Sequence, residues 1–285
     1  MKALSILIPT FNDECVTLVK DLREQTELLG IDYEILVGDD GSTDARVVHN
    51  NRAINLWPHC QFLERSVNEG RSAIRNFLAQ QAHFHWLLFI DSDMVVCKQD
   101  FIALYAKTQA PVVDGGVTIG HVIPGNLRSM YEKAVEQQHT AERRQLSPYQ
   151  DFHTANFLVR RDIMLAHPFD QRFHEYGYED VLFGKVLQQH GIPIQHINNP
   201  LSFEIYEQNA EFVRKTEEGL RTLYRFRDEL QGYSRILAWA EKVPHLPLRL
   251  CHRLFVSWER RNLVGRHPQL WIFKLYKLGY YLSLS

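Results

Sequence analysis

The sequence predicts an α/β fold, with a mostly parallel sheet flanked by helices and a helical C-terminal extension. Short apolar runs at residues 4–8 and 87–90 do not alternate with polar residues, which is typical of strands buried on both faces. Segments with helical periodicity separate such runs through roughly the first 100 residues. Polar loops follow the runs, at the edge of the sheet where ligands bind in such folds.

The first half of the chain alternates strands and helices. Pro9 ends the first apolar run, and Gly30 ends a helix whose apolar residues recur three and four positions apart. Strands are predicted at residues 4–8, 33–37, 61–64 and 87–90. Helices are predicted at residues 14–29 and 45–56, and after the loop at 68–72.

The second half is less regular. A dense polar face predicts a helix at 125–144, and Gly191 and Pro193 stop a helix that begins at Val181. Strands are predicted at residues 112–117, 156–159 and 194–197. The other helices are predicted at residues 162–166, 181–189 and 210–230.

The composition is that of a globular chain with one large domain, or one domain with an appendage: 285 residues, 45% hydrophobic and 23% charged. The net charge is −2, but residues 242–285 carry eight Lys or Arg and one acidic residue. That segment is therefore +7 and the rest −9. The asymmetry indicates an anionic surface as a partner, whereas nothing upstream supports nucleic-acid binding.

Cysteine spacing indicates a reducing, cytoplasmic environment. The four cysteines form no CxxC pair, so neither a zinc site nor a disulfide framework is suggested. The apolar run at the N-terminus is too short for a signal peptide, and no 18-residue apolar stretch is present to span a membrane.

Three acidic pairs stand where a ligand crevice is expected. Asp91 and Asp93 follow the strand at 87–90, Asp39 and Asp40 follow the strand at 33–37, and the pair at 179–180 precedes a helix. Two carboxylates at a strand end are tolerated most easily beside a hard cation such as Mg²⁺ or Mn²⁺. The alternative is that these pairs are solvated turns and helix caps. No GxGxxG follows the first strand, which argues against a nicotinamide or flavin site.

Five motifs together resemble a family 2 glycosyltransferase of the GT-A fold, in that family's order and approximate spacing. They are SILIPTFN at 5–12, VGDDGSTD at 37–44, NEG at 68–70 with AIRN at 73–76, FIDSD at 89–93, and YED at 178–180. The resemblance covers roughly residues 1–230, which defines a catalytic domain and leaves 231–285 as a basic, aromatic extension.

The resemblance implies an inverting transfer of a sugar from a nucleotide sugar, typically a UDP-sugar, to a hydroxyl of a glycan or lipid-linked acceptor in surface polysaccharide synthesis. Asp40 would accept a hydrogen bond from the nucleobase, in a pocket lined by Pro9 and Phe11. The other residues implied on the nucleotide-sugar side are Asp39, Arg71, Arg75, Asp91 and Ser92.

The resemblance also implies the metal and the base. Asp93, with Asp91, would bind Mn²⁺ or Mg²⁺ at the diphosphate. Asp180 would be the general base with Glu179 beside it, and the helix dipole is expected to hold Asp180 ionised.

One position departs from the family pattern. Phe203 stands where a metal-binding histidine is expected, and a phenylalanine cannot ligate. His196 or Glu204 would take over, or Asp93 would suffice with the diphosphate and water. A non-catalytic sugar-nucleotide-binding or scaffolding protein on the same fold therefore stays open. A nucleotidyltransferase is disfavoured, because the loop after the first strand is not a Gly-rich, basic loop.

The extension fits an interfacial helix. Leu250, Leu254 and Trp258 share one helical face among basic residues, as in segments that lie on anionic membranes. Such contact would place the protein peripherally on the inner membrane face. The alternative is a helical appendage packed on the catalytic domain or on another subunit.

Overall fold

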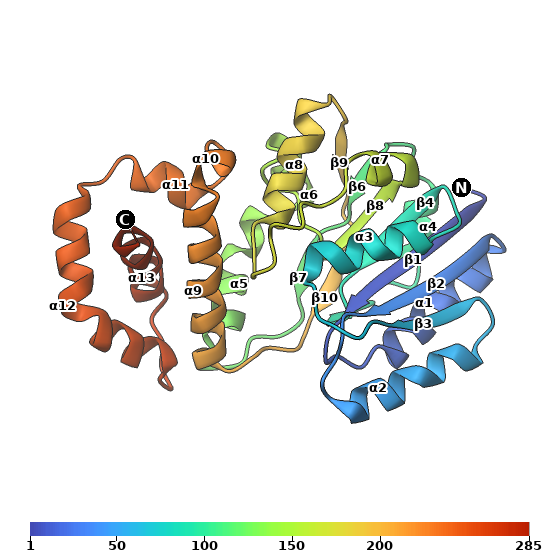
Figure 1. Ribbon diagram of the computed structural model, residues 1–285, viewed down its shortest axis with the longest axis horizontal. Helices are drawn as coiled ribbons and strands as arrows, with labels where there is room; N and C mark the ends of the chain where they lie inside the picture. The colour runs from blue at the N-terminus through green and yellow to red at the C-terminus, as the bar shows by residue number, and fades with distance from the viewer. Residues whose placement is uncertain (285) are drawn as a thin grey trace.

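A seven-stranded sheet, to the right of centre in Figure 1, organises the computed structural model, which describes residues 1–284. The strand order is β3-β2-β1-β4-β8-β6-β9. Strands β1 to β4 are mutually parallel, β8 runs antiparallel between β4 and β6, and β9 is parallel to β6. The prediction of a mostly parallel sheet is confirmed. The strands are β1 (Ala3–Thr10), β2 (Asp32–Asp39), β3 (Cys60–Glu64), β4 (Trp86–Ile90), β6 (Val112–Asp114), β8 (Asn156–Arg160) and β9 (Ile194–His196).

The apolar runs are continuous because the sheet is covered on both faces. In β4, Leu88 and Ile90 belong to one hydrophobic cluster, whereas Leu87 and Phe89 belong to the other. Helices α1 and α4 contribute to the first cluster, and α3, α7 and α8 to the second. These helices are α1 (Val16–Leu29), α3 (Arg71–Gln81), α4 (Phe101–Ala106), α7 (Arg161–Ala166) and α8 (Glu179–Gln189).

Four predicted elements are broken in the structure. The single strand predicted at 112–117 divides at Gly115 and Gly116, because the chain leaves β6 and enters a second sheet of order β5-β10-β7. Gly116 has a positive φ of 82°, and a Cβ at Gly115 would lie 2.6 Å from the Asn199 carbonyl oxygen, so the crossing needs glycine. The strands of this sheet are β5 (Met94–Val95), β7 (Val117–Ile119) and β10 (Leu201–Phe203).

The other three breaks occur in predicted helices. The helix predicted at 210–230 divides at Phe226, between residues 209–225 and 227–230. The helix predicted at 125–144 becomes two α-helices and a short 3₁₀ turn, and Thr140 caps the second α-helix by accepting a hydrogen bond from the Arg143 N–H. The helix predicted at 45–56 ends its α-helical part at Asn51. The resulting elements are α2 (Ala45–Asn51), η1 (Arg52–Leu56), α5 (Leu127–Val135), η2 (Glu136–Gln138) and α6 (Ala141–Leu146).

The C-terminal helices pack against α9 on the side away from the seven-stranded sheet (Figure 1). Two clusters hold them there: one joins Leu220 of α9 to Tyr281 of α13, and the other joins Leu127 of α5 to Phe273 of α13. None of the helices in the described residues is long and apolar enough to cross a membrane. The helices are α9 (Asn209–Arg225), α10 (Arg227–Leu230), α11 (Arg235–Ala240), α12 (His245–Val264) and α13 (Leu270–Ser283). Ser285, the last residue of the predicted extension, lies outside the described part.

Candidate active site

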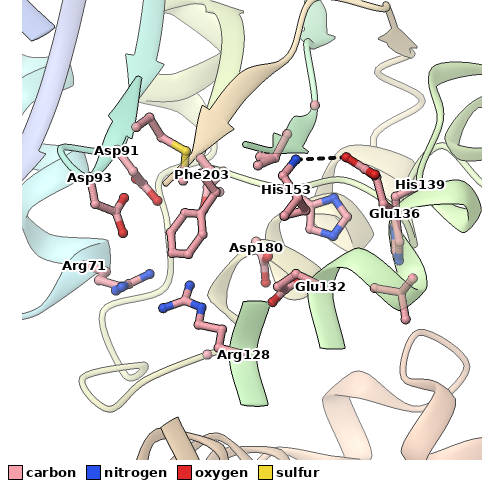
Figure 2. Close-up of a pocket in the computed structure, with 18 of the residues that line it drawn as sticks. Arg71, Asp91, Asp93, Arg128, Glu132, Glu136, His139, His153, Asp180 and Phe203 are labelled. Atoms are coloured by element: carbon pink, nitrogen blue, oxygen red, sulfur yellow. Dashed lines mark hydrogen bonds between the residues drawn. The ribbon is translucent and has the colours of Figure 1, made fainter. Parts of the chain in front are cut away.

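A cavity of about 280 Å³ lies beyond the carboxyl end of β4, between α5, the start of α8 and the small sheet. Its charged walls come from distant parts of the chain (Figure 2). The labelled charged or imidazole side chains are those of Arg71, Asp91, Asp93, Arg128, Glu132, Glu136, His139, His153 and Asp180. The sequence predicted the members from β4, α3 and α8. It did not predict those from α5 or from the loops around His139 and His153.

Arg75 ties the two predicted acidic groups together. Its Nη2 lies 2.7 Å from Oδ1 of Asp91, and its Nη1 lies 3.3 Å from Oε1 of Glu179. The Arg75 residue is 1% exposed, and its guanidinium carbon lies 5.7 Å from the centre of the Phe169 ring. One buried cation therefore fixes the end of β4 relative to the start of α8.

Asp91 and Asp93 share the cavity wall and lie in the turn that follows β4. Burial and the neighbouring Asp91 carboxylate raise the pKa of Asp93 to about 6. Ser92, between them, points elsewhere, because its hydroxyl donates a 2.9 Å hydrogen bond to Oδ2 of Asp13. The structure thus keeps both carboxylates on the cavity and uses the serine to tie the loop after β4 to the loop after β1.

The start of α8 presents Asp180 to the same cavity. Gly177 and Tyr178 have φ values of 94° and 69°, and this left-handed turn leads directly into Glu179 and Asp180. The Val181 N–H donates a 2.8 Å hydrogen bond to Asp180 Oδ1. Burial and the adjacent Glu179 nevertheless raise the pKa of Asp180 to about 6. Desolvation and like charge therefore outweigh the Val181 N–H and the helix dipole in setting this pKa, and the carboxyl is still mostly ionised at pH 7.

Two arginines face the Asp91 and Asp93 end of the cavity. The guanidinium carbon of Arg71, at the start of α3, lies 4.8 Å from the centre of the Tyr176 ring. The guanidinium carbon of Arg128, from α5, lies 4.1 Å from the centre of the Phe203 ring. Figure 2 shows both guanidinium groups directed into the same part of the cavity, with the Phe203 ring beside Arg128.

The opposite end of the cavity is formed by Glu132, His139 and His153. The two histidine ring centres are 5.5 Å apart. Burial lowers the pKa of His139 to about 4, so this imidazole is neutral at pH 7, and burial raises the pKa of Glu132. Arg128 and Glu132 are four residues apart on α5 and thus on one helix face. This i, i+4 pair in the predicted polar face was the available sequence signal, but it could not reveal what the face covers.

The residues implied for the base pocket lie together, away from the cavity walls. Thr10 of β1 pairs with Asp39 of β2, so the ends of these strands are adjacent. Oδ2 of Asp40 accepts a 2.8 Å hydrogen bond from the Gly70 N–H, and Asp39 accepts from the backbone and hydroxyl of Ser42. Both carboxylates therefore hold loops in place. Pro9 lies on β1 just before this edge, and Phe11, just after it, is 42% exposed.

His196 is not placed with Asp91 and Asp93. Its Nε2 lies 2.9 Å from the Pro148 carbonyl oxygen, and its Nδ1 lies 3.0 Å from Nη1 of Arg144. The same Nη1 is 2.7 Å from Oδ1 of Asp114, and this trio is buried. The assignment of His196 as a metal ligand is thus corrected: β9 carries it into a structural ion-pair cluster, where both ring nitrogens already have partners.

The donor set for a metal is therefore incomplete on the protein side. No three His, Cys, Asp or Glu side chains within residues 1–284 are gathered as a metal-binding group. Asp91 is already paired with Arg75, and Phe203 offers no ligand atom. Asp91 and Asp93 fit an ion that draws its other ligands from a diphosphate and water, which is a common arrangement for Mg²⁺.

The chain belongs to glycosyl transferase family 2, whose family model matches residues 5–166. It is 29% identical over 106 residues to an uncharacterized glycosyltransferase of Haemophilus influenzae, and 31% identical over 104 residues to a poly(ribitol-phosphate) beta-glucosyltransferase of Bacillus spizizenii. Each match covers 36% of this chain, but only 38% and 16% of those two proteins.

Solved structures confirm the predicted GT-A fold. S. aureus TarS 1–349 in complex with UDP-GlcNAc matches with a TM-score of 0.51 and 16% identity, over 100% of this chain and 91% of that one. The mannosyltransferase PcManGT of Pyrobaculum calidifontis, in complex with GDP-Man and Mn²⁺, matches with a TM-score of 0.52 and 14% identity, over 98% and 84% of the two chains.

The buried trio of Asp114, Arg144 and His196 should control stability. Replacing Arg144 by Met leaves the Asp114 carboxylate buried without its cation, which typically costs about 3–5 kcal/mol of unfolding free energy. The exposed neighbour Arg143 is the matched control, and Arg143→Met should change stability by less than about 0.5 kcal/mol. Urea unfolding followed by circular dichroism measures both. Equal stability of the two variants would contradict the structural role assigned to this trio.

Proposed function

We propose that the protein is an inverting glycosyltransferase, which moves a sugar from a nucleotide-sugar donor, in the simplest case a UDP-sugar, to a hydroxyl of a glycan or lipid-linked acceptor. The observation that carries this proposal is the shared cavity of Asp91, Asp93 and Asp180. The carboxylates proposed to serve the donor and the carboxylate proposed as the base therefore line the same cavity. Membership of glycosyl transferase family 2 and the UDP-GlcNAc complex of TarS support it. In this proposal residues 1–230 form the catalytic domain.

The nucleotide half of the donor is proposed to occupy the ends of β1 and β2. The exposed ring of Phe11 offers a stacking surface for a base. Asp40 accepts hydrogen bonds from Arg65, from the Glu69 N–H and from the Gly70 N–H, and one lone pair remains on its Oδ2 to accept a hydrogen bond from the base. Asp91 is proposed to contact the ribose or the donor sugar, because Arg75 fixes its carboxylate just after the end of β4, on the cavity wall.

Asp180 is proposed to take the proton from the acceptor hydroxyl. Its raised pKa of about 6 makes it a stronger base than an ordinary aspartate while it remains largely ionised at pH 7. Glu179, held by Arg75, keeps the start of α8 in position, and its negative charge contributes to the raised pKa of Asp180. Inversion requires the base on the face of the sugar opposite the leaving diphosphate.

A divalent cation, Mn²⁺ or Mg²⁺, is proposed at Asp93 with Asp91 as its neighbour. When bound, such an ion supplies Lewis-acid neutralisation of the leaving diphosphate. The Mn²⁺ in the PcManGT complex supports a divalent ion on this fold. The protein residues themselves do the rest: they orient the donor, hold the base and exclude water.

The acceptor is proposed to be a sugar hydroxyl of a growing surface polysaccharide. Glu132, His139 and His153 offer carboxylate and imidazole groups at the far end of the cavity, which suit hydrogen bonds to a polyol. The Bacillus spizizenii relative is described as a poly(ribitol-phosphate) beta-glucosyltransferase, and this description supports an acceptor of a polymeric kind.

Asp180→Asn should remove most of the activity, and the remaining activity should no longer fall at acid pH. In the wild type, kcat/KM for UDP release from UDP-sugars should fall as pH drops through about 6, because the base must be ionised and burial raises its pKa to that value. The variant should lose at least about 100-fold in rate, since general-base catalysis contributes about 10²–10⁴-fold, while it still binds UDP. A panel of UDP-sugars assayed between pH 4 and pH 9 measures this.

The matched control for this prediction is Asp228→Asn, at a side chain that is 90% exposed, which should leave the rate unchanged. UDP affinity measured at each pH separates the titration of Asp180 from that of Asp93, because only the latter lies at the donor end. Unchanged UDP release by Asp180→Asn would reject Asp180 as the base. An acid limb near pH 4 would reject the raised pKa.

We also propose that the extension, residues 231–285, rests on an anionic membrane surface, on the inner face in a cytoplasmic protein. Packing on α9 leaves an apolar side of α12 and α13 exposed, including Leu250, Leu254 and Trp258, all more than half exposed. The rings of Trp258 and Trp271 join the two helices at a centre distance of 6.4 Å. Exposed Arg253, Arg261 and Lys274 surround these residues, a combination that suits anionic lipid.

Vesicle binding tests this surface. The protein should co-sediment with vesicles of phosphatidylglycerol and phosphatidylcholine, less at high salt, and the double variant Leu254→Ser, Trp258→Ser should lose most of that binding. Leu28→Ser with Leu56→Ser is the control, because these leucines are 86% and 83% exposed on the sheet domain. Equal sedimentation of both double variants would contradict the proposed surface.

A further inference from the structure

The donor end of the cavity contains hydrogen-bond donors that nothing in the protein uses. No hydrogen bond or ion pair reaches the Arg71 guanidinium from any other residue in the described range, 1–284; its contact is with the face of the Tyr176 ring. The Nε of Arg128 is buried and has no partner among the same residues. A guanidinium carries five N–H donors. Arg71 is exposed, so its donors are open to an incoming ligand, whereas the buried Nε of Arg128 is costly without a partner. Unused donors of this kind on a cavity wall indicate a missing acceptor.

Arg128 is held rigidly enough to act as a recognition group. Its Nη1 pairs with Glu207, whose other oxygen lies 3.3 Å from Nζ of Lys215. The guanidinium carbon lies 4.1 Å from the centre of the Phe203 ring, and the side chain is 17% exposed. Stacking on the ring fixes the plane of the guanidinium, so its remaining donors keep one direction, toward the space that Arg71 also faces (Figure 2).

Two arginines, Arg71 and Arg128, supply the cationic groups at this end of the cavity. Asp91 and Glu179 share one cation, Arg75, whereas Glu207 is shared by two cations, Arg128 and Lys215. Arg71 has no ion-pair partner among the described residues, and with Arg128 it lies opposite Asp93 on the cavity wall. A phosphate group accepts parallel N–H bonds from guanidinium forks and is the anion that this geometry suits.

We propose, on the basis of the proposed function, that Arg128 and Arg71 form a clamp that binds the β-phosphate of the nucleoside-diphosphate donor directly, with Phe203 as the platform that orients Arg128. The β-phosphate is assigned because it carries the sugar that must lie within reach of Asp180, which lines the same cavity. Phe203 thereby has a use at the position where the sequence pattern led us to expect a metal ligand. The clamp neutralises the leaving diphosphate by fixed guanidinium groups.

The test compares UDP with UMP, which lacks the β-phosphate, by calorimetry on the full chain, both in EDTA and with Mn²⁺. Arg128→Ala should weaken UDP binding about 10- to 100-fold, which corresponds to one or two charge-assisted hydrogen bonds, and should change UMP binding less than about twofold. Arg128→Lys keeps the ion pair with Glu207 but has no planar fork, so it should show the same selective loss if Arg128→Ala folds poorly. Phe203→Leu should give a smaller loss in the same direction.

Arg160→Ala is the matched control. Arg160 pairs with Trp86 at the opposite end of β4 from Asp91, and the variant removes the same charge; UDP and UMP binding should both be unchanged. Equal weakening of UDP and UMP by Arg128→Ala, or no weakening of either, would overturn the clamp while leaving the proposed function intact. A wild-type protein that binds neither nucleotide would instead contradict the proposed function, and the clamp with it.

Discussion

The ion pairs of Arg75 with Asp91 and Glu179 are the constraint on which the site depends. They join three elements that are far apart in the sequence: the end of β4, the helix α3 and the start of α8. A buried guanidinium is expensive unless its charge is compensated, and Arg75 is the cation that pairs with both carboxylates. Loss of any one of them would free the two acidic groups to move relative to each other. The glycosyltransferase chemistry that we propose requires that their separation stay fixed.

Around this link, burial gives otherwise similar carboxyl groups different properties. Asp91 is held by a cation, whereas Asp93 and Asp180 are desolvated beside another carboxylate, which raises the pKa of each to about 6. Arginines face one end of the cavity, and Glu132 with two histidines faces the other. Since Asp91 and Asp93 lie at the arginine end, that end carries charges of both signs, which suits the proposed diphosphate donor with its cation, and the other end suits a neutral, hydroxyl-rich acceptor.

Local signals in the sequence were sufficient for most of the sheet. The runs at 4–8 and 87–90 are apolar because β1 and β4 are covered on both faces, and this pattern can be recognised from the sequence alone. The positions of the carboxylates at the ends of β2 and β4 could be predicted in the same way, because these residues come at the ends of those strands in the sequence. The strand at 112–117 was misjudged because its division depends on which sheet each half joins, which is a tertiary property.

The far wall of the cavity could not be predicted for the same reason. Arg128 and Glu132 occur in an ordinary polar helix, and only the packing of α5 against the small sheet turns that face toward Asp93 and Asp180. His196 was a plausible ligand by residue type, but the register of β9 beside β6 places it at Asp114. Its two nitrogens are then occupied by Arg144 and by a backbone carbonyl.

The most direct measurement is the titration of UDP into the intact chain by isothermal calorimetry, with GDP and dTDP run in parallel. The account predicts saturable, one-to-one binding of UDP in competition with UDP-sugars, and a change in affinity when Mn²⁺ is added, since Asp91 and Asp93 lie at the diphosphate end. If none of the three nucleoside diphosphates binds, with or without Mn²⁺, the cavity is not a nucleotide-sugar site and the central claim is contradicted.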